Sequence, residues 1–79
     1  MKIDLAEYKT KKELLSVFAD NFEELYGNNY DALYDVLTEI DVPFTLEIVN
    51  IDKYEQKDAL LDLLEDARTY NKNLTITIE

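Results

Sequence analysis

Three short segments of the chain alternate polar and apolar residues, and each predicts a β-strand. They are residues 2–5 (Lys-Ile-Asp-Leu), 44–48 (Phe-Thr-Leu-Glu-Ile) and 74–78 (Leu-Thr-Ile-Thr-Ile). Successive side chains of a strand point to opposite faces of the sheet, so this alternation indicates strands with one buried face and one solvated face.

The segments between these strands show the spacing of amphipathic helices. Thr10 and Glu13 match a capping box, and apolar residues follow at positions 14, 15, 18 and 22. Asp52 and Glu55 match a second box, so we expect another helix from there to about Tyr70. Its apolar stripe consists of Leu60, Leu63, Leu64 and Ala67.

A third helix is expected between these two. Asn28 or Asn29 can cap its N-terminus, and Pro43 favours extended backbone at Val42, which ends the helix before the second strand. Gly27, the only glycine, falls in the preceding turn, where a positive φ costs least. The helical wheel predicts a buried stripe of Tyr30, Leu33, Leu37, Ile40 and, at its margin, Val36.

The order of elements is therefore strand, two helices, strand, helix, strand. Strands joined through helices pair most readily in parallel, and alternating strands leave one face of the sheet uncovered. We expect an α/β fold, a two-layer domain with a three-stranded parallel sheet and its helices packed on one face. No repeat, linker or low-complexity tract divides residues 1–79, so a single domain is expected.

Composition removes several classes of function. Among 79 residues there is no cysteine and no histidine, which leaves no disulfide framework, no thiolate metal site and no nucleophile with its usual base. We expect no cofactor, no bound metal and no enzyme activity. No stretch resembles a signal peptide or is long enough to span a bilayer, so a soluble cytoplasmic protein is predicted.

The charge is strongly acidic and unevenly placed. Eighteen acidic residues against eight basic ones give a formal net charge of −10, which repels nucleic acid and anionic membranes and attracts basic partners. No Lys or Arg occurs between Glu13 and Asp52, a window that holds ten carboxylates. Solubility alone is one explanation of this acidity.

The middle helix carries an acidic face. On the wheel, Tyr34, Thr38, Asp31 and Asp35 share one exposed patch, with Glu39 further round. Asp31 belongs to the first turn, where the helix dipole favours an anion. Asp35 is mid-helix, and its i,i+4 spacing to Asp31 and Glu39 should cost about 0.2–0.5 kcal/mol each. This uncompensated cost favours a functional surface, and a merely solvated face is the alternative.

Recognition is the chemistry that this surface suits best. A glycosidase needs a cleft between its carboxylates, whereas these project from one convex helix. Carboxylates on a rigid helix beside tyrosine rings can take the places of phosphates and bases, because an arginine fork pairs with either anion. The surface would then mimic nucleic acid without binding nucleic acid itself.

The segment "LYGNNYDALYDVLTEI" resembles the signature of the barstar family, intracellular inhibitors of the ribonuclease barnase. The similarity extends more weakly through Pro43 and Glu47 and through "LEDARTYNKNLTITIE", so it covers nearly the whole chain. It implies a three-stranded parallel sheet with packed helices, and a second helix that plugs a ribonuclease active site. The implied partner is a small basic extracellular ribonuclease, which a monomer of this chain binds in a 1:1 complex. No interaction with a membrane is expected.

The resemblance also implies roles for individual residues. Asp35 is the principal anchor for the cationic groups that hold the scissile phosphate, and Asp31 lies beside it. Thr38 sits at the edge of this contact, and Tyr34 stands where the family commonly has Trp. Gly27 and Asn29 shape the preceding loop, and Asp66 on the last helix makes a peripheral charge contact. Tyr26 is also predicted to contact the partner, with a place in the core as the alternative.

Two positions depart from the family pattern. Leu25 replaces a tyrosine that packs over the nuclease histidine, and Asn28 replaces an acidic residue. These departures bear on which nuclease is the target. Two rival functions also remain open: an acidic adaptor for another basic protein, and a weak hydrolase or divalent-cation binder built on Asp31, Asp35 and Glu39.

Overall fold

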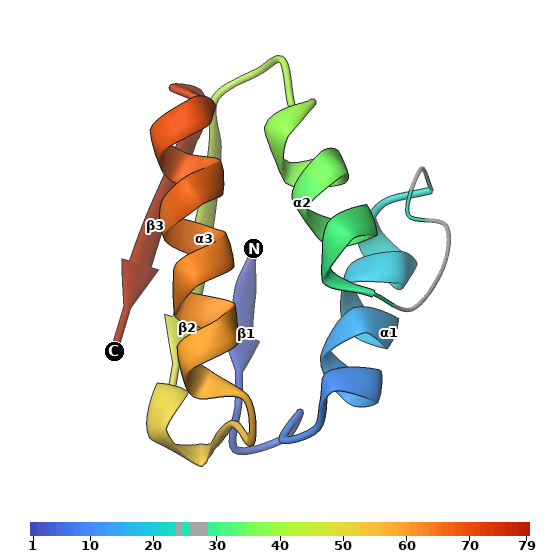
Figure 1. Ribbon diagram of the computed structural model, residues 1–79, viewed down its shortest axis with the longest axis vertical. Helices are drawn as coiled ribbons and strands as arrows, with labels where there is room; N and C mark the ends of the chain where they lie inside the picture. Colours follow the sequence, from blue (N-terminus) through green and yellow to red (C-terminus); the bar gives the residue numbers. More distant parts are fainter. Residues whose placement is uncertain (24, 26–28) are drawn as a thin grey trace.

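The elements of the protein follow the predicted order (Figure 1). The computed structural model describes residues 1–23, 25 and 29–79. In chain order the elements are β1 (Lys2–Asp4), α1 (Lys11–Asn21), α2 (Tyr30–Thr38), β2 (Phe44–Val49), the 3-10 turn η1 (Ile51–Lys53), α3 (Lys57–Tyr70) and β3 (Leu74–Ile78).

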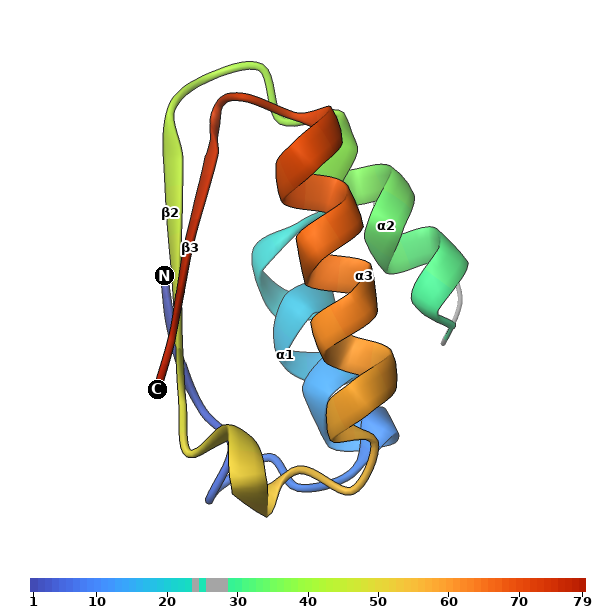
Figure 2. The ribbon, with the colours of Figure 1, turned by 60° about the vertical axis from the view of Figure 1, so that its left-hand side comes forward.

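The three strands form one parallel sheet in the order β1-β2-β3. Ile3 of β1 pairs with Ile48 of β2, and Leu46 of β2 pairs with Ile76 of β3. These side chains are buried, while Thr45 and Thr75 of the opposite face are exposed. Figure 2 shows α1, α2 and α3 together on one side of the sheet. The predicted two-layer α/β architecture is confirmed.

One hydrophobic cluster fills the space between the sheet and the helices. The helices bury most of the residues in the stripes that their spacing predicts, and Val36, expected at the margin of α2, is buried. Phe22 is the exception in the first stripe: it follows α1 as its C-cap residue and is half-buried. Tyr30 and Ile40 are half-buried and pack against this cluster. Ile40 falls outside the helix, because α2 ends at Thr38.

Two of the predicted helix caps are formed. The hydroxyl of Thr10 accepts a hydrogen bond from the backbone N–H of Glu13 (3.2 Å), and the Glu13 carboxylate accepts one from the backbone N–H of Thr10 (3.2 Å). The side chain of Asn29 caps α2 by accepting from the backbone N–H of Ala32 (2.7 Å). Each cap satisfies a helix N–H that has no partner within the helix.

The predicted capping box of Asp52 and Glu55 is wrong. α3 begins only at Lys57, and its N-cap residue, Gln56, makes no side-chain capping bond. Asp52 lies in η1 and forms an ion pair with Lys57 (Nζ to Oδ1, 2.6 Å). The Glu55 carboxylate instead accepts a hydrogen bond from the backbone N–H of Lys11 (3.0 Å), at the start of α1. The backbone N–H of Lys11, which the fold brings close to Glu55, thus takes the place of the predicted partner Asp52.

Among the helices that the structure describes, none is long and apolar enough to cross a membrane.

Candidate protein-binding surface

The first turn of α2 is tied to the segment that leads into α3. The Tyr30 hydroxyl donates to Oε1 of Gln56 (2.7 Å) and shares a hydrogen bond of 2.7 Å with the Tyr54 hydroxyl. The ammonium group of Lys11 lies 4.9 Å from the centroid of the Tyr30 ring. Burial raises the pKa of both Tyr54 and Tyr30 above the ordinary value of a tyrosine.

The C-terminal end of α2 is held by Asn71, a contact that the sequence analysis missed. The amide nitrogen of Asn71 donates to the backbone carbonyls of Leu37 and Ile40, both at 2.9 Å. Asn71 is only 7% exposed, and it follows directly after α3. The sequence hints at this contact only in that a polar residue, Asn71, directly follows the apolar stripe of α3. Contacts from other elements therefore hold α2 at both of its ends.

Asp31 and Asp35 are exposed on successive turns of α2, and Glu39 is exposed one turn further, as the C-cap residue of the helix; we call these three residues the acidic ridge. All eight Lys and Arg residues belong to the described part of the chain. The ion pairs found in that part are Lys57 with Asp52 and Arg68 with Glu65, and neither includes a member of the ridge. The charge of the ridge is therefore not neutralised by the chain's own cations.

Tyr34 and Thr38 are less exposed than the sequence predicts. Tyr34 is half-buried and packs against the core. Thr38 is also half-buried, and its hydroxyl hydrogen lies within reach of the backbone carbonyls of Tyr34 (2.9 Å) and Asp35 (3.1 Å). Tyr34 and Thr38 follow Tyr30 at intervals of four residues, so they lie on the same flank of α2, which faces α3. Only part of the Tyr34 side chain and part of the Thr38 side chain remain available to a partner.

Asp66 is exposed on α3. On the helical wheel it lies opposite Leu64 and Arg68, which border a hollow together with Ile76 of β3. β3 is the edge strand on the side of the sheet away from α2 (Figure 1). The flank of α3 that faces away from β3, which includes Asp66, is therefore the flank nearer α2. Asp66 therefore belongs to the same side of the molecule as the Tyr34 flank of α2.

The loop before α2 is described only in part. Asn29 is its exposed last residue. Tyr26 and Gly27, predicted as contacts, and Asn28, the second departure from the family pattern, lie outside the described residues. Leu25 is 8% exposed and belongs to the core cluster.

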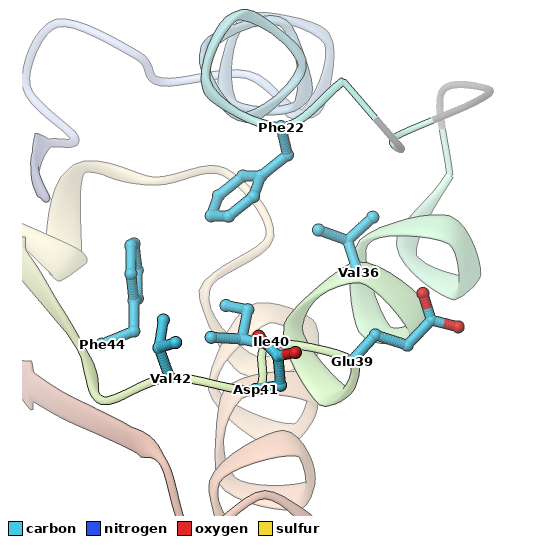
Figure 3. A pocket seen from close by; sticks show the side chains of 7 residues that line it. All are labelled: Phe22, Val36, Glu39, Ile40, Asp41, Val42 and Phe44. Carbon is cyan, nitrogen blue, oxygen red and sulfur yellow. The ribbon is translucent and has the colours of Figure 1, made fainter.

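A recess opens on the other flank of α2, and the sequence analysis did not anticipate it. Its volume is about 390 Å³. Figure 3 shows apolar side chains from the end of α1, from α2 and from the start of β2 around this space, with two carboxylates beside them. The lining residues are Phe22, Val36, Glu39, Ile40, Asp41, Val42 and Phe44.

Within residues 1–23, 25 and 29–79, no group of three or more acidic, cysteine or histidine side chains is placed to hold a metal ion. Asp31, Asp35 and Glu39 do not form such a group. They follow one another along the helix surface as separate charges, an arrangement suited to a row of cationic groups on another molecule.

Comparison with known protein families decides where this chain belongs. The family model Barstar, described as barstar (barnase inhibitor), matches residues 1–79, the whole chain. The chain belongs to the barstar family. A search of curated proteins finds no match. The barstar family is a family of inhibitors. The match confirms the family predicted from the central segment, and the three-stranded parallel sheet is the fold that this resemblance implied.

Proposed function

We propose that the chain inhibits a small basic ribonuclease of the barnase type, and that it does so as a monomer in a 1:1 complex. The observation that carries this proposal is an acidic ridge without internal counter-charges, on a helix anchored at both ends, in a member of the barstar family. The chain then acts as a single domain in the cytoplasm and has no enzyme activity of its own.

The proposed mechanism is occupation of the nuclease's phosphate-binding site by carboxylates. Asp35 pairs with the arginine and lysine side chains that otherwise hold the scissile phosphate, and Asp31 contacts the same group of cations. An arginine fork forms parallel hydrogen bonds with a carboxylate much as it does with a phosphate, which makes the substitution effective.

The other contacts surround this centre. Tyr34 and Thr38 offer their exposed parts beside Asp35, and Asp66 makes a peripheral charge contact from α3. Asn29 contributes from the start of α2. In this proposal Tyr26 and Gly27 shape the loop that enters the active site.

A titration of barnase with the protein tests the proposal. Hydrolysis of a fluorogenic RNA substrate should fall linearly to zero at one equivalent of the protein. Because Leu25 and Asn28 depart from the family pattern, the same titration is made with each small basic ribonuclease purified from the native host. Full activity of all these nucleases in excess protein would contradict inhibition. Binding to a basic protein that is not a nuclease would then identify an adaptor.

A further inference from the structure

The recess beside α2 is a built apolar hollow with an acidic rim. Phe22, at the end of α1, and Phe44, at the start of β2, approach with ring centroids 5.6 Å apart and ring planes tilted by 59°. Val36 and Ile40 project into the space below Phe22 (Figure 3). The volume of about 390 Å³ falls in the range of small ligand sites, about 300–1,000 Å³. Val42 is 58% exposed, so the hollow is open to solvent.

The rim restricts which occupant fits. Glu39 and Asp41 are exposed beside the hollow, and neither forms an ion pair with any of the eight basic residues, all of which are described. A purely apolar occupant would gain nothing from these two hydrated carboxylates, and an anion would be repelled by them. An apolar stem that ends in a cation meets both the walls and the rim.

Arginine fits these surroundings better than lysine. Its guanidinium is more weakly hydrated than an ammonium, stacks on aromatic rings and pairs with carboxylates through a planar fork. Phenylalanine rings line this recess, and two carboxylates lie at its rim.

The recess is continuous with the acidic ridge. Glu39 belongs to both, and as the C-cap residue of α2 it lies one turn beyond Asp35. A protein seated on Asp31 and Asp35 therefore reaches the mouth of the recess without leaving the helix.

We propose that the recess between α1, α2 and β2 receives an arginine side chain of the protein that binds the acidic ridge. The identity of that protein rests on the proposed function, whereas the chemistry of the occupant rests on the recess alone. The contact adds specificity at the C-terminal end of α2, one helical turn beyond the Asp35 anchor.

A peptide titration tests the occupant without any nuclease. The probe is the blocked tripeptide acetyl-Gly-Arg-Gly-amide, followed by methyl NMR signals of Val36, Ile40 and Val42. We expect saturable shifts at these methyl groups, and an affinity about fivefold lower in the paired variant Glu39→Gln and Asp41→Asn. The norleucine analogue of the peptide should not saturate the site.

A control variant separates a local contact from general charge attraction. The pair Glu47→Gln and Asp62→Asn removes the same charge from exposed positions of β2 and α3. Its affinity for the arginine peptide should stay within about twofold of the unchanged protein. Equal losses in both pairs, equal binding of the norleucine peptide, or no shift at the three methyl groups would overturn the arginine occupant.

The nuclease assay distinguishes this inference from the proposed function. Arginine-peptide binding at the recess, together with no inhibition of any ribonuclease, supports the occupant and overturns the inhibitor function. Inhibition that Asp35→Ala removes, but that the Glu39→Gln and Asp41→Asn pair leaves within twofold, supports the inhibitor and overturns the occupant.

Discussion

Asp35 lies exposed in the middle of α2, one turn from Asp31 and one turn from Glu39. Both spacings bring like charges together and cost the helix about 0.2–0.5 kcal/mol each. Nothing in the described part of the chain pairs with the Asp35 carboxylate. A carboxylate that costs stability and has no hydrogen-bond or ion-pair partner among the described residues is understandable if its interactions are made in a complex.

Replacing Asp35 by alanine should separate binding from stability. We expect Asp35→Ala to weaken binding to a barnase-type ribonuclease by about 3 kcal/mol or more, because the nuclease's buried cations lose their partner. Glu39→Ala should cost less than about 1 kcal/mol, since its contact stays at the rim. The free energy of unfolding should be unchanged or higher, because alanine is the better helix former. Isothermal titration and urea unfolding measure the two quantities.

Asp20→Ala is the matched control for this comparison, since Asp20 is an exposed aspartate of α1. It changes the net charge equally and should leave the affinity close to that of the unchanged protein. Equal losses of affinity in Asp35→Ala and Glu39→Ala would rule out Asp35 as the anchor.

The buried hydroxyls of Tyr30 and Tyr54 predict a loss of stability in alkali. Burial raises the pKa of both groups in the folded protein, so folding favours their protonated forms. Their contribution is complete below the unfolded value of about 10 and is lost as the pH rises above it. Urea unfolding between about pH 9 and 11 should show a smaller loss of stability in Tyr54→Phe than in the unchanged protein.

Tyr70→Phe is the control, because Tyr70 is 72% exposed. Its alkaline loss of stability should match that of the unchanged protein. If Tyr54→Phe showed the same loss as Tyr70→Phe, the buried tyrosine pair would not be the cause.

At the scale of elements, the termini of α2 depend on two different kinds of contact. Its N-terminus is capped locally by Asn29, three residues from the N–H that it satisfies. The carbonyls near its C-terminus are satisfied by Asn71, 34 and 31 residues away in the chain. The orientation of the acidic ridge therefore depends on the end of α3 as well as on α2 itself.

Removing the Asn71 amide should destabilise the whole fold. Asn71→Ala leaves the carbonyls of Leu37 and Ile40 without this donor, and we expect the free energy of unfolding to fall by about 1–3 kcal/mol. Urea denaturation followed by circular dichroism measures it. Asn21→Ala is the control, because its amide donates to the Val17 carbonyl (2.9 Å) at an exposed site. A loss no larger than that of the control would show that Asn71 does not hold α2.

At the scale of the whole molecule, the formal charge of −10 is the dominant property. Its effect extends beyond the contact surface, because the field of the whole protein acts on a basic partner before they touch. The pair of barnase and barstar is itself a standard example of such steering.

Salt should therefore slow association with a basic ribonuclease. Raising the ionic strength from about 0.01 M to 0.15 M shortens the Debye length from about 30 Å to 8 Å, which screens the long-range attraction. We expect the association rate constant, measured by stopped-flow fluorescence, to fall steeply, while the dissociation rate constant changes much less. An association rate independent of salt would contradict electrostatic steering of the encounter.

Contacts between residues close together in the chain could be predicted from the sequence, whereas contacts between residues far apart in the chain could not. The cap at Thr10 was predicted, and Asn29 was one of two candidates for the cap of α2, because donor and acceptor are three residues apart in each case. The box at Asp52 and Glu55 matched the same spacing and was wrong, because Glu55 meets the backbone of Lys11, 44 residues away. The acidic ridge follows from helical periodicity alone, whereas the recess beside it needs side chains from α1, α2 and β2.

The sequence by itself determined the order of strands and helices, the single covered face of the sheet and the row of carboxylates on α2. Each depends on the periodicity of apolar and polar side chains, 2 residues in a strand and 3.6 in a helix, which is visible in the sequence. Only the tertiary structure decided how α2 is anchored, how far Tyr34 and Thr38 are covered, and where a recess opens. Those features arise from groups far apart in the chain, whose meeting depends on how the layers pack.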